Sequence, residues 1–226
     1  MEYNSKEILS IFNNLKDMTH LNIEDIESGC LDFLYNYFSF EHYYGASKVV
    51  IIPNNESDYV IKIPFNEYSY ETDDSYGCMY YDSTPLTNAN KNKIHYWDYC
   101  FNELYRYHIA KQNNYEQFFA KVKLIGQVGK FPIYAQQRVN ANKNSYKTLP
   151  LDKYHTILNS IKKQGVCPRI DINWLGSIEE IYGTEYMLKF VDFLHEQKWD
   201  DDLTSYNVGY TFQDEPIIFD FAGFDD

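Results

Sequence analysis

The chain has 226 residues, with 33 acidic side chains against 20 basic ones and a formal net charge of −13. Hydrophobic residues make up 44% and aromatic residues 18% of the sequence, which excludes an intrinsically disordered chain. The length allows one sizeable domain or a compact pair of lobes. An isoelectric point near 4.8 argues against a general phosphate-backbone binder, since that function depends on clustered Lys and Arg, but it leaves a local basic groove open. We therefore do not expect nucleic acid among its partners.

No stretch approaches the roughly 20 apolar residues that a membrane span needs, and the polar residues 1–16 are unlike a secretory signal. The four cysteines form no C-x-x-C pair, which favours reduced, structural thiols. They are Cys30, Cys78, Cys100 and Cys167. We therefore expect a cytoplasmic protein without a membrane partner.

The first elements in chain order are two helices, predicted at residues 5–17 and 23–38 from apolar side chains at helical spacing. The pattern then changes to the short β-branched runs Val49–Pro53 and Tyr59–Pro64. A turn-prone Asn- and Ser-containing segment separates these runs, so they predict a β-hairpin.

Residues 66–96 are rich in Tyr, Asp, Asn and Ser and show no clear period. They predict a long surface insertion, with a small hairpin around Gly77. The tyrosines of this segment either form a partner surface or pack the insertion itself, and the sequence leaves both alternatives open. They include Tyr68, Tyr70, Tyr76, Tyr80 and Tyr81.

Helical spacing returns over residues 97–112, and two strands are predicted after it, at Phe118–Val128 and Phe131–Val139. A tight turn at Gly129-Lys130 joins these two strands. The polar stretch Asn140–Ser145 is the best candidate for a linker between two lobes.

The rest of the chain is predicted to be mostly helical, with helices at residues 151–163 and about 178–197. One face of the longer helix is apolar and contains Ile181, Leu188, Val191 and Leu194. The final alternating runs, Val208–Phe212 and Ile217–Phe221, predict a closing hairpin.

Three polar residues near the C-terminus stand at a spacing that favours phosphoryl transfer. Asp202 and Asn207 are five positions apart, and Asp220 follows thirteen later inside an apolar run. The Asn207 amide and the Asp220 carboxylate are hard oxygen ligands of the kind that a phosphate-bound metal needs. Asp202 is placed to orient an incoming hydroxyl and accept its proton. A carboxylate in an apolar run is costly unless it is paired, which favours a functional Asp220.

Here the sequence resembles the protein-kinase-like superfamily. Asp202–Asn207 matches its D-x-x-x-x-N catalytic loop, and Asp220-Phe221-Ala222 resembles its D-F-G metal motif. The strand containing Lys62 resembles the V-A-I-K strand, which implies that Lys62 holds the α- and β-phosphates of ATP. The resemblance also implies that Glu103, on the 97–112 helix, pairs with Lys62. Asn207 and Asp220 would then bind Mg²⁺.

The glycine-rich loop of the family corresponds to the segment with Gly45 and Ser47, which would cover the nucleotide. Two other acidic residues, Glu67 and Glu116, are poorer candidates for the partner of Lys62 because neither lies within the 97–112 helix. Thr204 and Ser205 lie in the catalytic loop, where they either assist the phosphate or form turn hydrogen bonds.

The resemblance implies an α+β, two-lobed protein-kinase-like fold with a truncated C-lobe. Its parts are an N-terminal helical extension (1–39), an N-lobe-like antiparallel sheet with an inserted helix (40–139), and a helical C-lobe (140–226). The family's His-Arg is replaced by Asp200-Asp201, which we interpret as a solvated charge run before a turn. Asp220 is followed by six residues, so we expect no counterpart of the family's activation segment and later helices.

We therefore expect an ATP- and Mg²⁺-dependent phosphotransferase, an atypical protein kinase that moves the γ-phosphoryl group to a protein Ser, Thr or Tyr hydroxyl. It is similar to short, divergent kinase-like proteins of bacteria and phages. The alternative is a pseudokinase-like interaction or inhibitor protein that binds a partner without catalysis. A nucleic-acid mimic is a third interpretation, and it would need the carboxylates along one exposed stripe.

Overall fold

The structure of the chain is a computed structural model. The protein is of the mixed α+β class, and its sheets are antiparallel. It describes residues 41–44, 48–53, 57–64, 67–70, 79–80, 94–97, 99–128, 131–140, 148–166, 169–201 and 203–221. The helices predicted at residues 5–17 and 23–38 lie outside these ranges. Among the described helices, none combines the length and the apolar character that a membrane span requires.

The chain divides into two compact units. The first contains the described residues up to Leu104 and the segment Val122–Gln137, and the second contains Tyr105–Lys121 and the described residues from Arg138 onward. The predicted lobes divide at residues 139 and 140. The second unit therefore takes in Tyr105–Lys121, which the sequence pattern placed with the first lobe.

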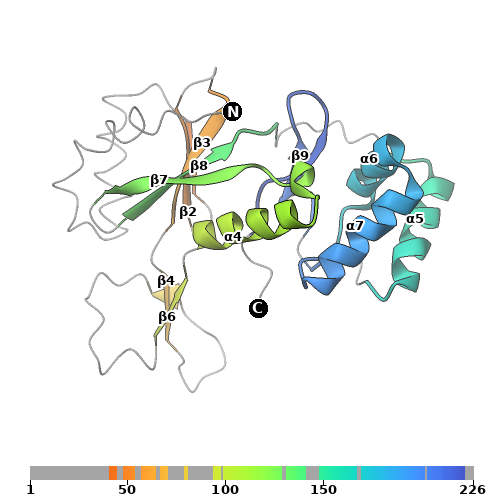
Figure 1. The fold of residues 1–226 in the computed structure, drawn as a ribbon, viewed down its shortest axis with the longest axis horizontal. Helices are drawn as coiled ribbons and strands as arrows, with labels where there is room; N and C mark the ends of the chain where they lie inside the picture. Colours follow the sequence, from red (N-terminus) through yellow and green to blue (C-terminus); the bar gives the residue numbers. More distant parts are fainter. Residues whose placement is uncertain are drawn as a thin grey trace. The chain divides into compact units, whose positions relative to one another are not determined.

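A five-stranded antiparallel sheet in the order β1-β2-β3-β8-β7 forms the framework of the first unit (Figure 1). Its strands are β1 (Glu41–Tyr44), β2 (Lys48–Ile52), β3 (Tyr59–Pro64), β7 (Val122–Val128) and β8 (Phe131–Gln137). The pairing of β2 with β3 and of β7 with β8 confirms the two hairpins predicted for these strands. The tight turn predicted at Gly129-Lys130 lies outside the described residues. The strand expected to start at Phe118 starts at Val122, because Glu116–Phe118 forms the short 3-10 helix η3.

A three-stranded sheet occurs in the region predicted as an insertion. Its strands are β4 (Glu67–Tyr70), β5 (Met79–Tyr80) and β6 (Ile94–Trp97), in the order β5-β4-β6. The pairing of β4 with β5 agrees with a hairpin that encloses position 77. Strand β6, which pairs with β4, is a further strand that the sequence pattern did not predict. The tyrosine side chains of this region lie outside the described part of the structure, so the alternatives of a partner surface and internal packing both stay predictions.

Helix α4 (Tyr99–Gln112) confirms the helix predicted at 97–112, but two charged side chains lie on its buried face beside Cys100 and Ala110. Glu103 and Arg106 are almost completely buried at positions three apart, where an amphipathic helix normally places apolar side chains. The aromatic side chains of Phe101 and Tyr105 are instead exposed. Burying charged groups is costly unless they are paired, so this face points to a built polar site.

After Arg138, the described residues of the second unit form three α-helices, α5 (Leu151–Lys163), α6 (Ile172–Tyr182) and α7 (Thr184–Glu196), and Figure 1 shows them together. The prediction of one helix over 178–197 was wrong. Gly183 ends α6 with a φ of 87°, a left-handed conformation that a continuous helix cannot accommodate. The expected apolar face is correspondingly interrupted: Leu194 is buried, whereas Ile181 is exposed.

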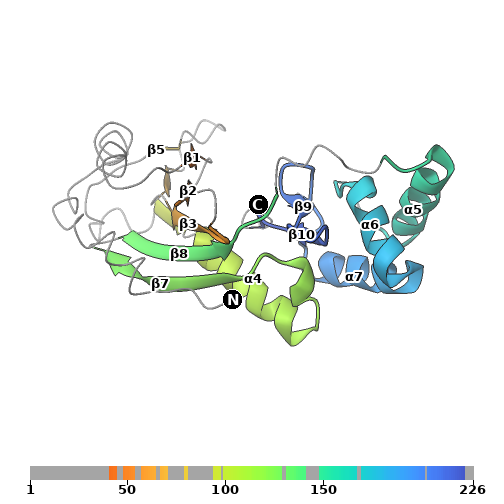
Figure 2. The ribbon, with the colours of Figure 1, turned by 90° about the horizontal axis from the view of Figure 1, so that it is seen from above.

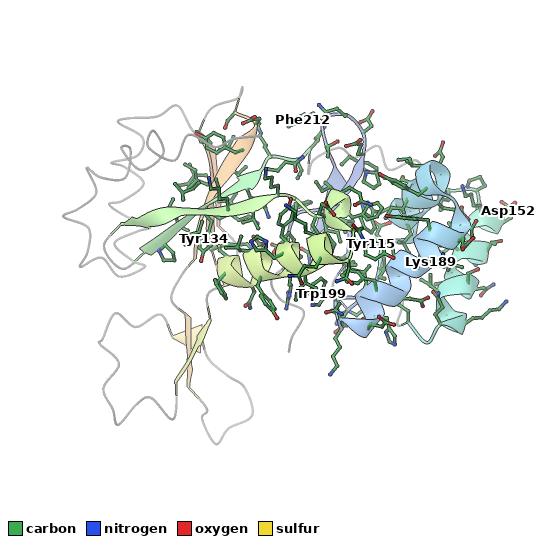
Figure 3. All side chains as sticks on the ribbon, viewed as in Figure 1. Tyr115, Tyr134, Asp152, Lys189, Trp199 and Phe212 are labelled. Carbon is green, nitrogen blue, oxygen red and sulfur yellow. The ribbon has the colours of Figure 1, made fainter. Side chains whose placement is uncertain are left out.

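Aromatic side chains form the core of the second unit around α7. Phe190 packs on Phe118 with ring centroids 4.4 Å apart, and Tyr115 lies 4.8 Å from Phe193. Figure 3 labels Tyr115 beside α7. Aromatic pairs at these distances add to the stabilisation that their burial gives, so the segment between α4 and β7 is anchored to the helices of this unit.

Strands β9 (Val208–Tyr210) and β10 (Pro216–Ile218) form the predicted closing hairpin (Figure 2). Its three paired positions are all buried in both strands. The backbone N–H of Asn140 donates to the backbone carbonyl oxygen of Tyr210 at 2.9 Å. The first residue of the predicted linker is therefore held by β9.

Candidate functional site

Glu103 is the centre of a buried polar cluster in the first unit. Its side chain is 0% exposed, and both carboxylate oxygens accept hydrogen bonds from the Lys62 ammonium at 2.9 Å. Lys48 donates to the same Oε1 atom at 2.8 Å, and the Gln136 amide donates to Oε2 at 3.4 Å. The predicted pairing of Lys62 with Glu103 is thus present, with two further donors that the sequence analysis did not assign to the site.

Strand register explains why these side chains converge. Val50 on β2 lies opposite Lys62 on β3, and Lys48 is two residues from Val50, so it projects from the same face as Lys62. Such diagonal neighbours lie about 7–8 Å apart, within reach of long side chains. Gln136 on β8 lies opposite Val60, which is two residues from Lys62. The sheet therefore presents all three donors on one face.

The burial of this cluster identifies it as more than a solvated surface pair. The side chains of Lys48 and Lys62 are each 4% exposed, and Glu103 is fully buried. Removing charged groups from water carries a large desolvation penalty, which the attraction between ion partners only roughly offsets. A buried ion pair adds little to stability compared with apolar side chains, so its presence favours a functional role.

Asn207 and Asp220, the predicted metal ligands, are joined through their backbones in the second unit. The carbonyl oxygen of Asn207 accepts hydrogen bonds from the N–H groups of Phe219 and Asp220, at 3.0 and 3.3 Å. Asn207 ends a turn in which its own N–H donates to the Thr204 carbonyl at 2.9 Å. The hairpin therefore brings these two residues together, as the sequence spacing predicts.

The surroundings of Asp220 differ from the sequence expectation. Strand β10 ends at Ile218, and Asp220 is partly exposed rather than enclosed in an apolar strand. An amide and a carboxylate carry oxygen atoms of the kind that Mg²⁺ binds, commonly one or two carboxylates together with substrate phosphates. Within the described part of the chain, no group of three His, Cys, Asp or Glu side chains is placed to hold a metal.

Arg106 anchors the residue that follows Asp220. Its guanidinium is buried and donates to the backbone oxygen of Phe221, and its Cζ atom lies 5.8 Å from the centroid of the Trp199 ring. Trp199, which contacts Arg106, is labelled in Figure 3. Phe221 itself is buried, with its ring 5.3 Å from that of Phe119. The predicted metal segment is therefore fixed on its C-terminal side.

The structure corrects the interpretation of Asp200 as part of a solvated charge run. Asp200 is buried and lies 2.8 Å from the Nδ1 atom of His195, so it is not a solvated charge. Asp201 is exposed and forms an ion pair with Arg169 at 3.2 Å, which agrees with the expectation for that residue. The two adjacent aspartates thus differ because only Asp200 faces the end of α7.

Three of the predicted site residues, Gly45, Ser47 and Asp202, lie outside the described residues. Glu116, one of the poorer candidates for the Lys62 partner, lies on η3 in the second unit.

The Glu116 carboxylate influences Tyr107, whose pKa is raised first by burial and then by this negative charge.

Sequence reasoning missed Lys48, Gln136 and Arg106 as members of these sites. The strand register makes both Lys48 and Gln136 diagonal neighbours of Lys62, but this register is known from the structure and not from the spacing of residues in the sequence. The sequence holds no signal for Arg106 either, because its partner is a backbone oxygen more than a hundred residues further along the chain.

Comparison of the chain with protein-family models, curated proteins and solved structures finds no match. The functional argument therefore depends on the residues and on the geometry described above.

Proposed function

We propose that the protein has a two-lobed kinase-like fold and is an ATP- and Mg²⁺-dependent phosphotransferase. It moves the γ-phosphoryl group of ATP to a Ser, Thr or Tyr hydroxyl of a protein. The observation that supports this proposal most strongly is the buried pair in which Lys62 contacts both carboxylate oxygens of Glu103 at 2.9 Å. A lysine on a central strand paired with a helix glutamate is the arrangement that phosphate positioning by kinases requires.

Lys62 binds the α- and β-phosphates, and Glu103 positions it. An ammonium group on a flexible four-carbon stem loses rotamer freedom when it binds a phosphate. Because Glu103 fixes the ammonium of Lys62 in advance, that ordering is already complete before ATP arrives. Preorganised positive charge of this kind stabilises developing negative charge without further reorganisation.

Asn207 and Asp220 hold Mg²⁺, which neutralises phosphate charge when it is bound. The support for this assignment is the pair of hydrogen bonds from the backbone of residues 219 and 220 to the Asn207 carbonyl. Asp202 accepts the proton of the acceptor hydroxyl, a role that its spacing from Asn207 predicts.

Transfer of label from [γ-³²P]ATP to protein acceptors tests the proposal. We expect Mg²⁺-dependent labelling by the wild type and its loss in Lys62→Ala and Asp220→Ala. Lys189→Ala is the matched control, because it removes an exposed lysine that also pairs with a glutamate. Equal labelling by the wild type and by both site variants would refute the proposal.

A second candidate is a pseudokinase-like protein that binds a partner without catalysis. The observation that favours this candidate is the replacement of the family's His-Arg by Asp200-Asp201. The Asp200 carboxylate forms a hydrogen bond with the His195 ring. Thermal unfolding discriminates the two, because a ligand that binds only the native state raises the midpoint. No shift with millimolar ATP and Mg²⁺, together with no labelling, would favour the binding protein.

A further inference from the structure

Lys48 occupies an unusual position in the Glu103 cluster. It is the first residue of β2, directly after the segment 45–47, and its ammonium is buried. Lys48 and Lys62 both donate to the Oε1 atom of Glu103, at 2.8 and 2.9 Å. Two ammonium nitrogens thus lie within hydrogen-bond distance of a single oxygen atom.

The pairing of Glu103 with a lysine does not explain this arrangement. Lys62 alone contacts both oxygens of the carboxylate, so a second lysine adds another desolvation penalty. Two like charges this close also repel each other, and a bound anion beside Glu103 would stabilise the pair of ammonium groups further. Burial and like-charge neighbours are combined at many functional sites.

We propose that Lys48 is a second phosphate-binding lysine, so that the site takes a ligand with at least two linked phosphate groups. This inference rests on the proposed function, because it assigns the ligand class of the same site. Each ammonium has three N–H donors and can bond a carboxylate and a phosphate oxygen at once. Two neighbouring cations match the adjacent charges of a nucleoside diphosphate or triphosphate, whereas a monophosphate offers only one such group.

The test compares binding of ATP, ADP, AMP and inorganic tripolyphosphate to the wild type and to Lys48→Met by isothermal titration calorimetry. Loss of one charge-assisted contact should weaken ATP and tripolyphosphate binding by about tenfold to a hundredfold. The affinity for AMP should change by less than about threefold. A general distortion would instead weaken all nucleotides alike. Lys189→Met, which removes an exposed lysine, should leave every affinity unchanged.

Circular dichroism checks the fold of each variant. If Lys48→Met does not fold, Lys48→Gln replaces it, because glutamine removes the charge and keeps a hydrogen-bond donor. Unfolding of both variants would assign Lys48 to the fold alone and overturn the inference. An unchanged ratio of ATP to AMP affinity in a folded variant would overturn it as well.

Failure of the inference is distinguishable from failure of the proposed function. Labelling from ATP by the wild type, together with an ATP affinity that Lys48→Met does not change, would refute the role of Lys48 alone. Tripolyphosphate binding that depends on Lys48, without any transfer of label, would support the inference and refute the phosphotransferase.

Discussion

Replacing Glu103 by Gln removes the charge around which the buried cluster is built. The neutral amide cannot compensate the two ammonium groups that now lie at 2.8 and 2.9 Å from its carboxylate. Breaking a buried ion pair by neutralising one partner typically costs about 3–5 kcal/mol. For a chain of this size we therefore expect Glu103→Gln to lower the thermal midpoint by about 6–20 °C.

Thermal unfolding followed by circular dichroism measures this change, and Glu185→Gln is its matched control. Glu185 also accepts a hydrogen bond from a lysine, at 2.7 Å from Lys189, but its side chain is 85% exposed. Solvent screens such a pair, so the control should hardly change the midpoint. Equal shifts of the thermal midpoint in Glu103→Gln and Glu185→Gln would show that burial of the Glu103 cluster does not cause the loss of stability.

A triple variant separates stability from function. Replacing Lys48 and Lys62 by Met and Glu103 by Leu removes every charge of the cluster, and such replacements are often neutral or stabilising. We expect the triple variant to recover most of the stability that Glu103→Gln loses, yet to bind no ATP. Recovery of ATP binding would contradict the assigned role of these residues.

The remaining predictions concern the second unit. Asp171 caps α6 by accepting from the N–H groups of Asn173 and Trp174 at 2.9 and 3.1 Å, so Asp171→Ala should lower the free energy of unfolding in urea by about 1 kcal/mol, and Asp171→Ser should restore most of it. Gly183→Ala forces a Cβ atom onto a φ of 87° in open space and should cost about 1–3 kcal/mol; an unchanged urea midpoint would refute the conformational explanation. Burial, and then neighbouring charges, raise the pKa of Tyr115 above 10.0. The unfolded hydroxyl thus ionises first, and stability should fall as the pH rises through 10.0 towards the folded pKa. Tyr115→Phe should reduce that fall, and an equal fall in both proteins would contradict it.

Local patterns predicted the hairpins, α4 and α5, because side-chain periodicity and turn residues are visible in the sequence itself. The pairing of Lys62 with Glu103 was instead implied by the resemblance to the protein-kinase-like superfamily. The structure adds the reason for the pairing, since β3 is the central strand of its sheet and Glu103 is completely buried on α4.

Features that depend on tertiary contacts or on backbone conformation were not predictable in this way. Gly183 looks tolerable inside a helical pattern, and only its left-handed φ shows that the helix ends there. Asp200 reads as a solvated charge until His195 is found beside it. Lys48 joins the site because of the pairing between β2 and β3, which the spacing of residues along the chain does not reveal.

Mg²⁺-dependent binding of ATP tests the central claim most directly. Titration of the wild type, Lys62→Met and Asp220→Asn with ATP should give tight binding only for the wild type in the presence of Mg²⁺. Lys62→Met should weaken binding with or without the metal, and Asp220→Asn should remove the effect of Mg²⁺. Wild-type binding that is absent, or that both variants retain with its Mg²⁺ dependence, would contradict the account.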